Sequence, residues 1–258
     1  MMTRYRVALD DRQLDTVASG IIIRDIAYTS PAEQHAASAL SARNGMHVQN
    51  TTFGTSSVTV SFEIHEADVK KRQDVCRKIQ AWAARGGWLT TNDKAGLRLR
   101  VRCSTLPAIN SAMRWTERLP MVFTAYEQPL WEDVYPTRVV SKESGAPKML
   151  YVDGTADRTV VDVVVENTGD EEINSLSVFA DSSYIELQNL ALAAGAKLEI
   201  GHDENDLLFI RAGGVSVMNK RTAESSDDLV ILCGTNNAVS FICEGSAKAT
   251  FTTRGRCV

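Results

Sequence analysis

The sequence lacks long apolar runs. No segment of its 258 residues approaches the roughly 20 consecutive apolar residues that a membrane-spanning helix requires. Its first residues, MMTRYRVALDD, also lack the apolar central region of a secretory signal peptide. We therefore expect a chain that is made and kept in a cytosol.

Cysteine is scarce as well. The five cysteines are an odd set, and no two of them have a CxxC spacing or another spacing typical of a metal site. We interpret them as reduced thiols, most of them small buried hydrophobic side chains, with Cys257 next to the chain end as the expected exposed exception. The full set is Cys76, Cys103, Cys233, Cys243 and Cys257.

The motifs of common catalytic and nucleotide-binding sites are missing. The sequence contains no GxGxxG before a helix, no GxxxxGK[ST], no GxSxG and no HExxH. Histidines are few and scattered, at His35, His47, His65 and His202. We therefore predict no catalytic, cofactor-binding or metal site, and no enzymatic activity.

Only His202 lies near a cluster of acidic residues, in the segment GHDEND. A metal site would use Asp203, Asn205 and Asp206, but a calcium loop of the EF-hand type would also need a central glycine and a downstream glutamate. A solvated turn is the favoured interpretation. The pair Asp227 and Asp228 is interpreted in the same way.

Tryptophan and proline are absent from the second part of the chain. All four tryptophans and all six prolines lie within the first 147 residues. The stretch PTRVVSKESGAP, residues 136–147, is polar and has a proline at both ends, which is typical of a linker. We predict two domains, residues 1–135 and residues 136–258.

The first half contains strand patterns and one helix pattern. VTVSFEI, residues 58–64, alternates apolar and polar side chains as a half-buried strand does. Residues 68–85 place Val75, Ile79 and Trp82 on one helical face, with Asp68 as a candidate N-cap. Further strands are expected in LRLRVRC, residues 97–103, and in MVFTAY, residues 121–126.

The second half is a series of short apolar segments separated by turns, and none has a helical periodicity longer than about ten residues. This spacing predicts an antiparallel β-sandwich. The fold class is therefore mainly β with one helix. The segments are VVDVVVE, LSVFA, KLEI, LLFI, VSVM, LVILC, AVSFIC and KATFTT.

Charge is unevenly distributed. The net charge is -4, but residues 1–133 carry 17 basic and 14 acidic side chains, whereas residues 134–258 carry 11 and 18. Opposed charges of this kind can steer self-association. Neither half is extreme, so nucleic-acid binding is not indicated as the main activity.

One strand concentrates positive charge. Arg98, Arg100 and Arg102 alternate with apolar residues, so the three guanidinium groups share one strand face. This face is solvated or paired within the chain, covered by a neighbouring subunit, or in contact with phosphate. No aromatic residue alternates with the arginines, which weakens a single-strand nucleic-acid site.

A sandwich can also bind carbohydrate. Sugar sites usually need an exposed aromatic platform, and the second half has no tryptophan. Tyr151, Tyr184 and four phenylalanines remain, and most of these phenylalanines are at core-like strand positions. Carbohydrate binding is therefore an alternative that this composition disfavours.

Several segments in a fixed order resemble the distal tail protein (Dit) family of siphophages, also called phage tail components. The resemblance covers nearly the whole chain, from Gly20 to Arg256. Each motif alone is weak, and the resemblance depends on their shared order and spacing. Two positions depart from the family pattern: Cys233 stands where a proline is common, and Gly201 follows Ile200 in place of an aspartate. The matching segments are GIIIRDIAYTSP, the Arg43 to Gly45 turn, TTFGTSSVTVSFEI, IQAWAARGGWL, the arginine-rich strand, FTAYEQPLWED, VVVENTGDEEINSLSVF, LAAGAKLEIGHDEN, LVILCGTNNAVSFICEG and TTRGR.

The resemblance implies a structural hub of the phage tail tip or baseplate. It implies a homo-hexameric ring formed by the N-terminal domain, a galectin-like C-terminal domain, and a channel through which DNA passes in transit. The implied partners are the tail tube protein, a tail-tip hub protein and a receptor-binding protein, in a virion assembled in the host cytoplasm. Since a ring needs a heterologous interface, we expect that interface on residues 1–133, with Arg98, Arg100 and Arg102 as candidates. The alternative function is a host-surface carbohydrate-binding adhesion module of the tail.

Overall fold

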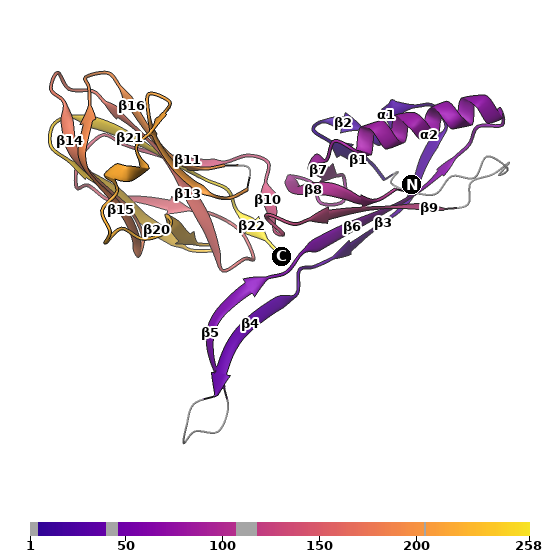
Figure 1. Cartoon of the computed structure of the whole chain (residues 1–258), viewed down its shortest axis with the longest axis horizontal. Helices are drawn as coiled ribbons and strands as arrows, with labels where there is room; N and C mark the ends of the chain where they lie inside the picture. Colours follow the sequence, from indigo (N-terminus) through magenta and orange to yellow (C-terminus); the bar gives the residue numbers. More distant parts are fainter. Residues whose placement is uncertain (1–4, 40–45, 107–117, 204) are drawn as a thin grey trace. The chain divides into compact units, whose positions relative to one another are not determined.

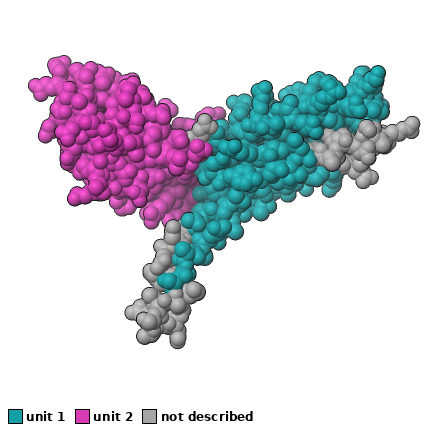
Figure 2. Space-filling model, in the orientation of Figure 1, with its two compact units in different colours: residues 1–131, 258 teal, residues 132–257 magenta. Residues whose placement is uncertain are grey.

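The structure is a computed structural model that describes residues 5–39, 46–106, 118–203 and 205–258. It divides into two compact units, Met1–Trp131 with Val258, and Glu132–Cys257 (Figure 2). Both units are built mainly of β-strands, and the first carries the one long helix (Figure 1), so the predicted fold class is confirmed. Among the described helices none is long and apolar enough to cross a membrane.

The first unit contains an antiparallel sheet with the strand order β2-β1-β7-β8-β9-β6-β3. The predicted alternation of residues 58–64 is confirmed, because Val58, Val60 and Phe62 are buried and the residues between them are partly exposed. The strands are β1 (Val7–Leu9), β2 (Arg12–Gln13), β3 (Ile21–Thr29), β6 (Ser56–Ile64), β7 (Gly87–Thr91), β8 (Leu97–Thr105) and β9 (Leu119–Ala125). A single helical turn, α1 (Leu14–Val17), follows β2.

Helix α2 (Val69–Ala83) confirms the helix predicted over residues 68–85, and it packs on this sheet through Trp82. The Asp68 carboxylate caps its first turn by accepting hydrogen bonds from the amides of Lys70 and Lys71, at 2.8 and 3.2 Å. Trp82 lies in the core, where its ring meets the Phe123 ring edge to face with 5.9 Å between centroids. Its indole N–H donates to the Arg12 carbonyl at 2.8 Å, which ties the end of the helix to β2.

A hairpin that the sequence patterns did not predict extends from this unit. Among the described strands, β4 (Glu33–Ala39) and β5 (Met46–Phe53) pair only with each other, and they continue beyond β3 and β6 (Figure 1). Residues 33–37 are exposed on both faces of the ribbon, so alternation of apolar and polar residues could not reveal it. The turn at residues 43–45 falls outside the described residues.

The second unit consists of two antiparallel sheets that enclose one core. One has the order β11-β21-β13-β16-β17-β18, with β19 beside β13, and the other has the order β12-β20-β14-β15. Fully buried side chains such as Val163, Val178, Phe241 and Phe251 fill the space between them, as expected for a sandwich. The strands are β11 (Thr137–Ser141), β12 (Lys148–Tyr151), β13 (Arg158–Asn167), β14 (Ile173–Ala180), β15 (Ser183–Leu192), β16 (Lys197–His202), β17 (Leu208–Ala212), β18 (Val215–Ser216), β19 (Val230–Leu232), β20 (Asn236–Cys243) and β21 (Ala247–Thr253).

The prediction of a linker over residues 136–147 is wrong. Residues 137–141 form β11, which pairs along its whole length with β21, and Ser141 is fully buried. The flanking prolines and the polar composition suggested a linker, but an edge strand tolerates both because only one of its sides is paired. The two units divide between Trp131 and Glu132.

Candidate functional site

The arginine strand is β8, and its neighbour β7 changes its chemistry. Arg98 and Arg100 lie on the face opposite the buried Leu99, and Trp88 of β7 pairs directly with Arg100. The guanidinium carbon of Arg98 lies 3.9 Å from the centre of the Trp88 ring, and that of Arg100 lies 5.6 Å from it. These are cation–π distances. The expectation that the arginines have no aromatic neighbour is therefore wrong, because the aromatic residue comes from the adjacent strand.

Arg102 does not belong to this cluster. Its guanidinium forms an ion pair of 2.7 Å with Glu127, and its side chain is 67% exposed. An exposed pair of this kind contributes about 0–1 kcal/mol to stability. The structure thus places Arg98 and Arg100 against the Trp88 ring, whereas the guanidinium of Arg102 pairs with Glu127.

The backbone of Trp88 is held firmly. The Asp10 carboxylate accepts a hydrogen bond of 2.9 Å from the Trp88 amide, and the Asp10 amide donates to the Trp88 carbonyl at 3.0 Å. The preceding Gly87 has a positive φ of 128°, and a Cβ at that position would overlap the Asp10 carboxylate. Glycine is therefore required for this contact.

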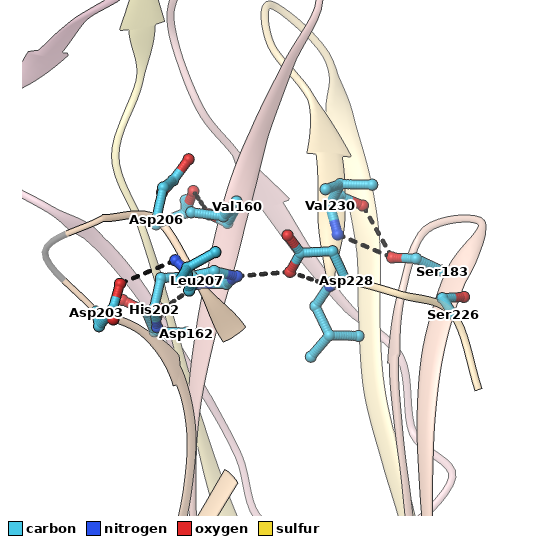
Figure 3. Close-up of polar contacts among 12 residues, drawn as sticks. Val160, Asp162, Ser183, His202, Asp203, Asp206, Leu207, Ser226, Asp228 and Val230 are labelled. Atoms are coloured by element: carbon cyan, nitrogen blue, oxygen red, sulfur yellow. Dashed lines mark hydrogen bonds and ion pairs between the residues drawn. The ribbon is translucent and has the colours of Figure 1, made fainter. Parts of the chain in front are cut away.

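The second unit contains a buried histidine between two aspartates (Figure 3). His202 lies at the end of β16, and its side chain is 4% exposed. Its Nδ1 lies 2.8 Å from an oxygen of Asp162 on β13, and its Nε2 lies 2.5 Å from an oxygen of Asp228, just before β19. Both ring nitrogens face carboxylate oxygens, which accept hydrogen bonds and do not donate them, so the geometry fits the doubly protonated imidazolium.

Electrostatics agree with this protonation state. Burial alone would lower the pKa of His202, but the hydrogen bonds and charges of Asp162 and Asp228 outweigh it and raise the pKa to about 9. The cluster therefore joins β16, β13 and the segment before β19 through a charged histidine. The interpretation of Asp228 as a merely solvated residue is wrong, since its carboxylate is part of this cluster.

The neighbouring groups give this cluster a structural role. Ser183 Oγ donates to the Ala180 carbonyl at 2.8 Å. It also accepts a hydrogen bond of 2.9 Å from the Val230 amide (Figure 3). Ser226 Oγ accepts from the Tyr184 amide at 3.0 Å. These hydroxyl groups hold backbone segments together and do not contact His202 as a nucleophile would.

The chain turns after His202, the last residue of β16, as interpreted, and the Asp206 amide donates a hydrogen bond of 3.0 Å to the Asp203 carbonyl. Asp203 accepts hydrogen bonds from the amides of Asn205 and Leu207, and Asp206 pairs with Arg256 at 2.6 Å. Within the described residues no group of three or more histidine, cysteine, aspartate or glutamate side chains is arranged to hold a metal ion.

Comparison with known proteins gives a match only at the level of structure. No protein-family model matches the chain, and no curated protein matches it. The crystal structure of Dit (gp 19.1) from phage SPP1 superposes with a TM-score of 0.70, at 9% sequence identity, over 98% of this chain and 99% of that chain. The chain has the fold of SPP1 Dit. The fold that the sequence resemblance implied is confirmed.

Two baseplate structures of phage P2 support the same assignment of the Dit-like fold. A chain of its activated, calcium-containing baseplate matches with a TM-score of 0.52 at 9% identity, over 99% of this chain and 98% of that chain. The strontium-containing form gives 0.50 at 9% identity, with 97% of each chain covered. SPP1 Dit is described as a paradigm of the hub adsorption apparatus in phages that infect Gram-positive bacteria.

Proposed function

We propose that this chain is a structural hub of a phage tail tip, in which six copies form a ring that joins the tail tube to tail-tip and receptor-binding proteins. The ring leaves a channel for DNA, and the protein is located at the tail tip of the virion. The observation that carries the proposal is the length of the structural match, which includes both units of the chain and almost all of SPP1 Dit.

The β4–β5 hairpin supports self-assembly. A two-stranded ribbon in water is marginally stable at best, and residues 33–37 of this one are all exposed. Packing against a neighbouring copy would bury the ribbon and stabilise it.

Strand β3 supports the same proposal. It has nine residues and is the last strand in its sheet order, so one side of it is an open edge of the described sheet. Long edge strands readily pair with another chain. Both features lie in the first unit, consistent with an interface on residues 1–133.

The proposed role needs no catalysis. Both ring nitrogens of the buried His202 face aspartates, so this histidine does not present the neutral nitrogen that a general base requires. We infer a purely architectural protein.

Carbohydrate binding is a second candidate because aromatic side chains do lie on an outer face of the sandwich. Tyr151 on β12 is 50% exposed, and Phe179 and Tyr184 stack on the same sheet with centroids 5.9 Å apart. On the other sheet, however, the guanidinium of Arg211 lies over the Phe209 ring, 4.4 Å from its centroid, and covers one face of it. A glycan array with the full chain and its Tyr151→Ala variant would test this function, which requires binding that the variant loses.

Native mass spectrometry of the purified full chain tests the proposed function. Six copies per particle are expected at micromolar concentration. A monomer over the whole accessible concentration range would contradict the proposal.

A further inference from the structure

Cys233 and Cys257 are two thiols of the second unit that approach the same stretch of backbone. Of the five cysteines only Cys76 is buried and the other four are partly exposed, so the expectation that most of them are buried is wrong. The Cys233 sulfur lies over Gly154, 3.2 Å from the point where a Cβ of that glycine would be. The backbone nitrogen of Arg256, the residue before Cys257, lies 3.0 Å from the same point. The two cysteines are thus near neighbours, although strands β20 and β21 separate them along the chain.

Electrostatics gives the same picture. Burial raises the pKa of the Cys233 thiol, the Arg256 backbone lowers it through a hydrogen bond, and the charge of Cys257 raises it again. A like charge shifts a pKa in this way only when it is a near neighbour. The two sulfurs are therefore close, and both side chains are open to a small oxidant because neither is fully covered.

The segment at residues 254–257 fastens the start of the second unit. The Asp133 amide donates to the Gly255 carbonyl at 2.9 Å, and the Gly255 amide donates to the Asp133 carboxylate at 3.1 Å. The Arg254 guanidinium donates to the Asp133 carbonyl at 2.8 Å. This segment therefore closes the second unit by joining its first residues to its last ones.

We propose that Cys233 and Cys257 are a redox pair that forms a disulfide outside the host cell and locks this closure. The bond ties the 254–257 segment to the residues after β19 and encloses β20 and β21 in a covalent loop. A cytoplasm keeps thiols reduced, whereas a released phage particle meets an oxidising medium. The redox pair goes beyond the proposed function, and only this setting rests on it.

The chemistry is thiol–disulfide exchange with a small-molecule disulfide such as oxidised glutathione. One cysteine thiolate attacks a glutathione sulfur, which breaks the glutathione S–S bond and releases one glutathione thiolate. The second cysteine thiolate attacks the mixed disulfide, forms the Cys233–Cys257 bond and releases the second glutathione. The two cysteines lose two electrons to oxidised glutathione, and the two thiol protons end on the two reduced glutathione molecules.

The test treats the purified, folded full chain with oxidised glutathione, unfolds it, alkylates the remaining thiols and counts them by mass spectrometry. The number of alkylated cysteines should fall from five to three, and a peptide pair linked through Cys233 and Cys257 should appear. The variants C233S and C257S should form no disulfide within the chain. The matched control C243S, which removes another partly exposed thiol of the second unit, should still form the link.

Urea unfolding followed by far-UV circular dichroism tests the lock. Closing a loop of this length restricts the unfolded chain, so oxidation should raise the urea midpoint of the second unit by about 1 M. C243S should show the same rise, and C257S should show none. If C257S does not fold, the oxidised and reduced forms of the unmodified chain decide, because that comparison needs no variant.

The outcomes are distinct. Separate glutathione adducts on Cys233 and Cys257, or links that join two copies or include Cys243, would overturn the redox pair. A Cys233–Cys257 link without a rise in the urea midpoint would overturn the lock. A monomer that forms the link would contradict the proposed ring and leave the redox pair intact, whereas a ring that fails to form it would do the reverse.

Discussion

Replacing His202 by glutamine should remove a pH-dependent part of the stability of the second unit. The pKa of His202 rises from an ordinary value of 6.5 to about 9 in the folded chain. At 1.36 kcal/mol per pKa unit, that rise corresponds to roughly 3 kcal/mol. Because the Asp162 and Asp228 side chains are 50% and 34% exposed, water screens the interaction, and we expect about 1–3 kcal/mol.

The direction with pH follows from the two pKa values. The folded chain binds the proton more tightly than the unfolded chain, so protonation stabilises the fold. The stabilisation should be complete below about pH 6.5 and should be lost as the pH rises through about 9. The unmodified chain and H202Q should therefore differ most at pH 6 and least above pH 9.

Urea unfolding of the full chain measures this difference. All four tryptophans lie in the first unit, so tryptophan fluorescence reports that unit, and far-UV circular dichroism adds the second. The fluorescence transition should be the same in both proteins and serves as an internal control. If H202Q and the unmodified chain lose stability in parallel between pH 6.5 and 9, the assignment of a charged, bridged His202 is refuted.

Three further predictions concern the first unit, and tryptophan fluorescence during urea unfolding can measure each of them. Removing the helix cap with D68A should cost about 1 kcal/mol, and a cost near zero would contradict the capping geometry. G87A should lower the free energy of unfolding by about 1–3 kcal/mol, because the added methyl group overlaps the Asp10 carboxylate and the backbone φ is positive. The control G96A also has a positive φ, but its methyl group meets no other atom, so the loss should be smaller. Hydrogen bonds from Arg24 and His65 lower the pKa of Glu63 to about 2, so Glu63 should contribute to the free energy of unfolding above about pH 4.5 and lose this contribution as the pH falls through about 2. If E63Q and the unmodified chain lose stability equally as the pH falls through this range, the prediction is refuted.

Patterns along the sequence predicted those parts of the fold that depend on local periodicity. The alternation of β6 and the apolar face of α2 are both observed, because an element that is buried on one side has apolar residues at a regular spacing along the sequence. The sequence instead predicts a linker where strand β11 lies, since a short and mostly exposed edge strand has no regular spacing of apolar residues. Residues 33–37 of β4 are exposed and leave no such pattern either, so the sequence does not predict the β4–β5 hairpin.

The candidate sites depend on pairing between distant strands, and this explains what sequence reasoning missed. Trp88 meets Arg98 and Arg100 only through the register of β7 and β8. Asp162 lies 40 residues from His202. In the sequence, Asp162 stands out only as a charged residue within the apolar run VVDVVVE, and nothing there indicates that it contacts His202. The ring itself was implied by resemblance to Dit proteins and not by composition or spacing.

Negative-stain electron microscopy of the purified full chain tests the central claim most directly. The proposed function predicts ring-shaped particles with six-fold symmetry and a central channel. Isolated monomers, or particles with no rotational symmetry, at concentrations where the protein is folded would contradict it.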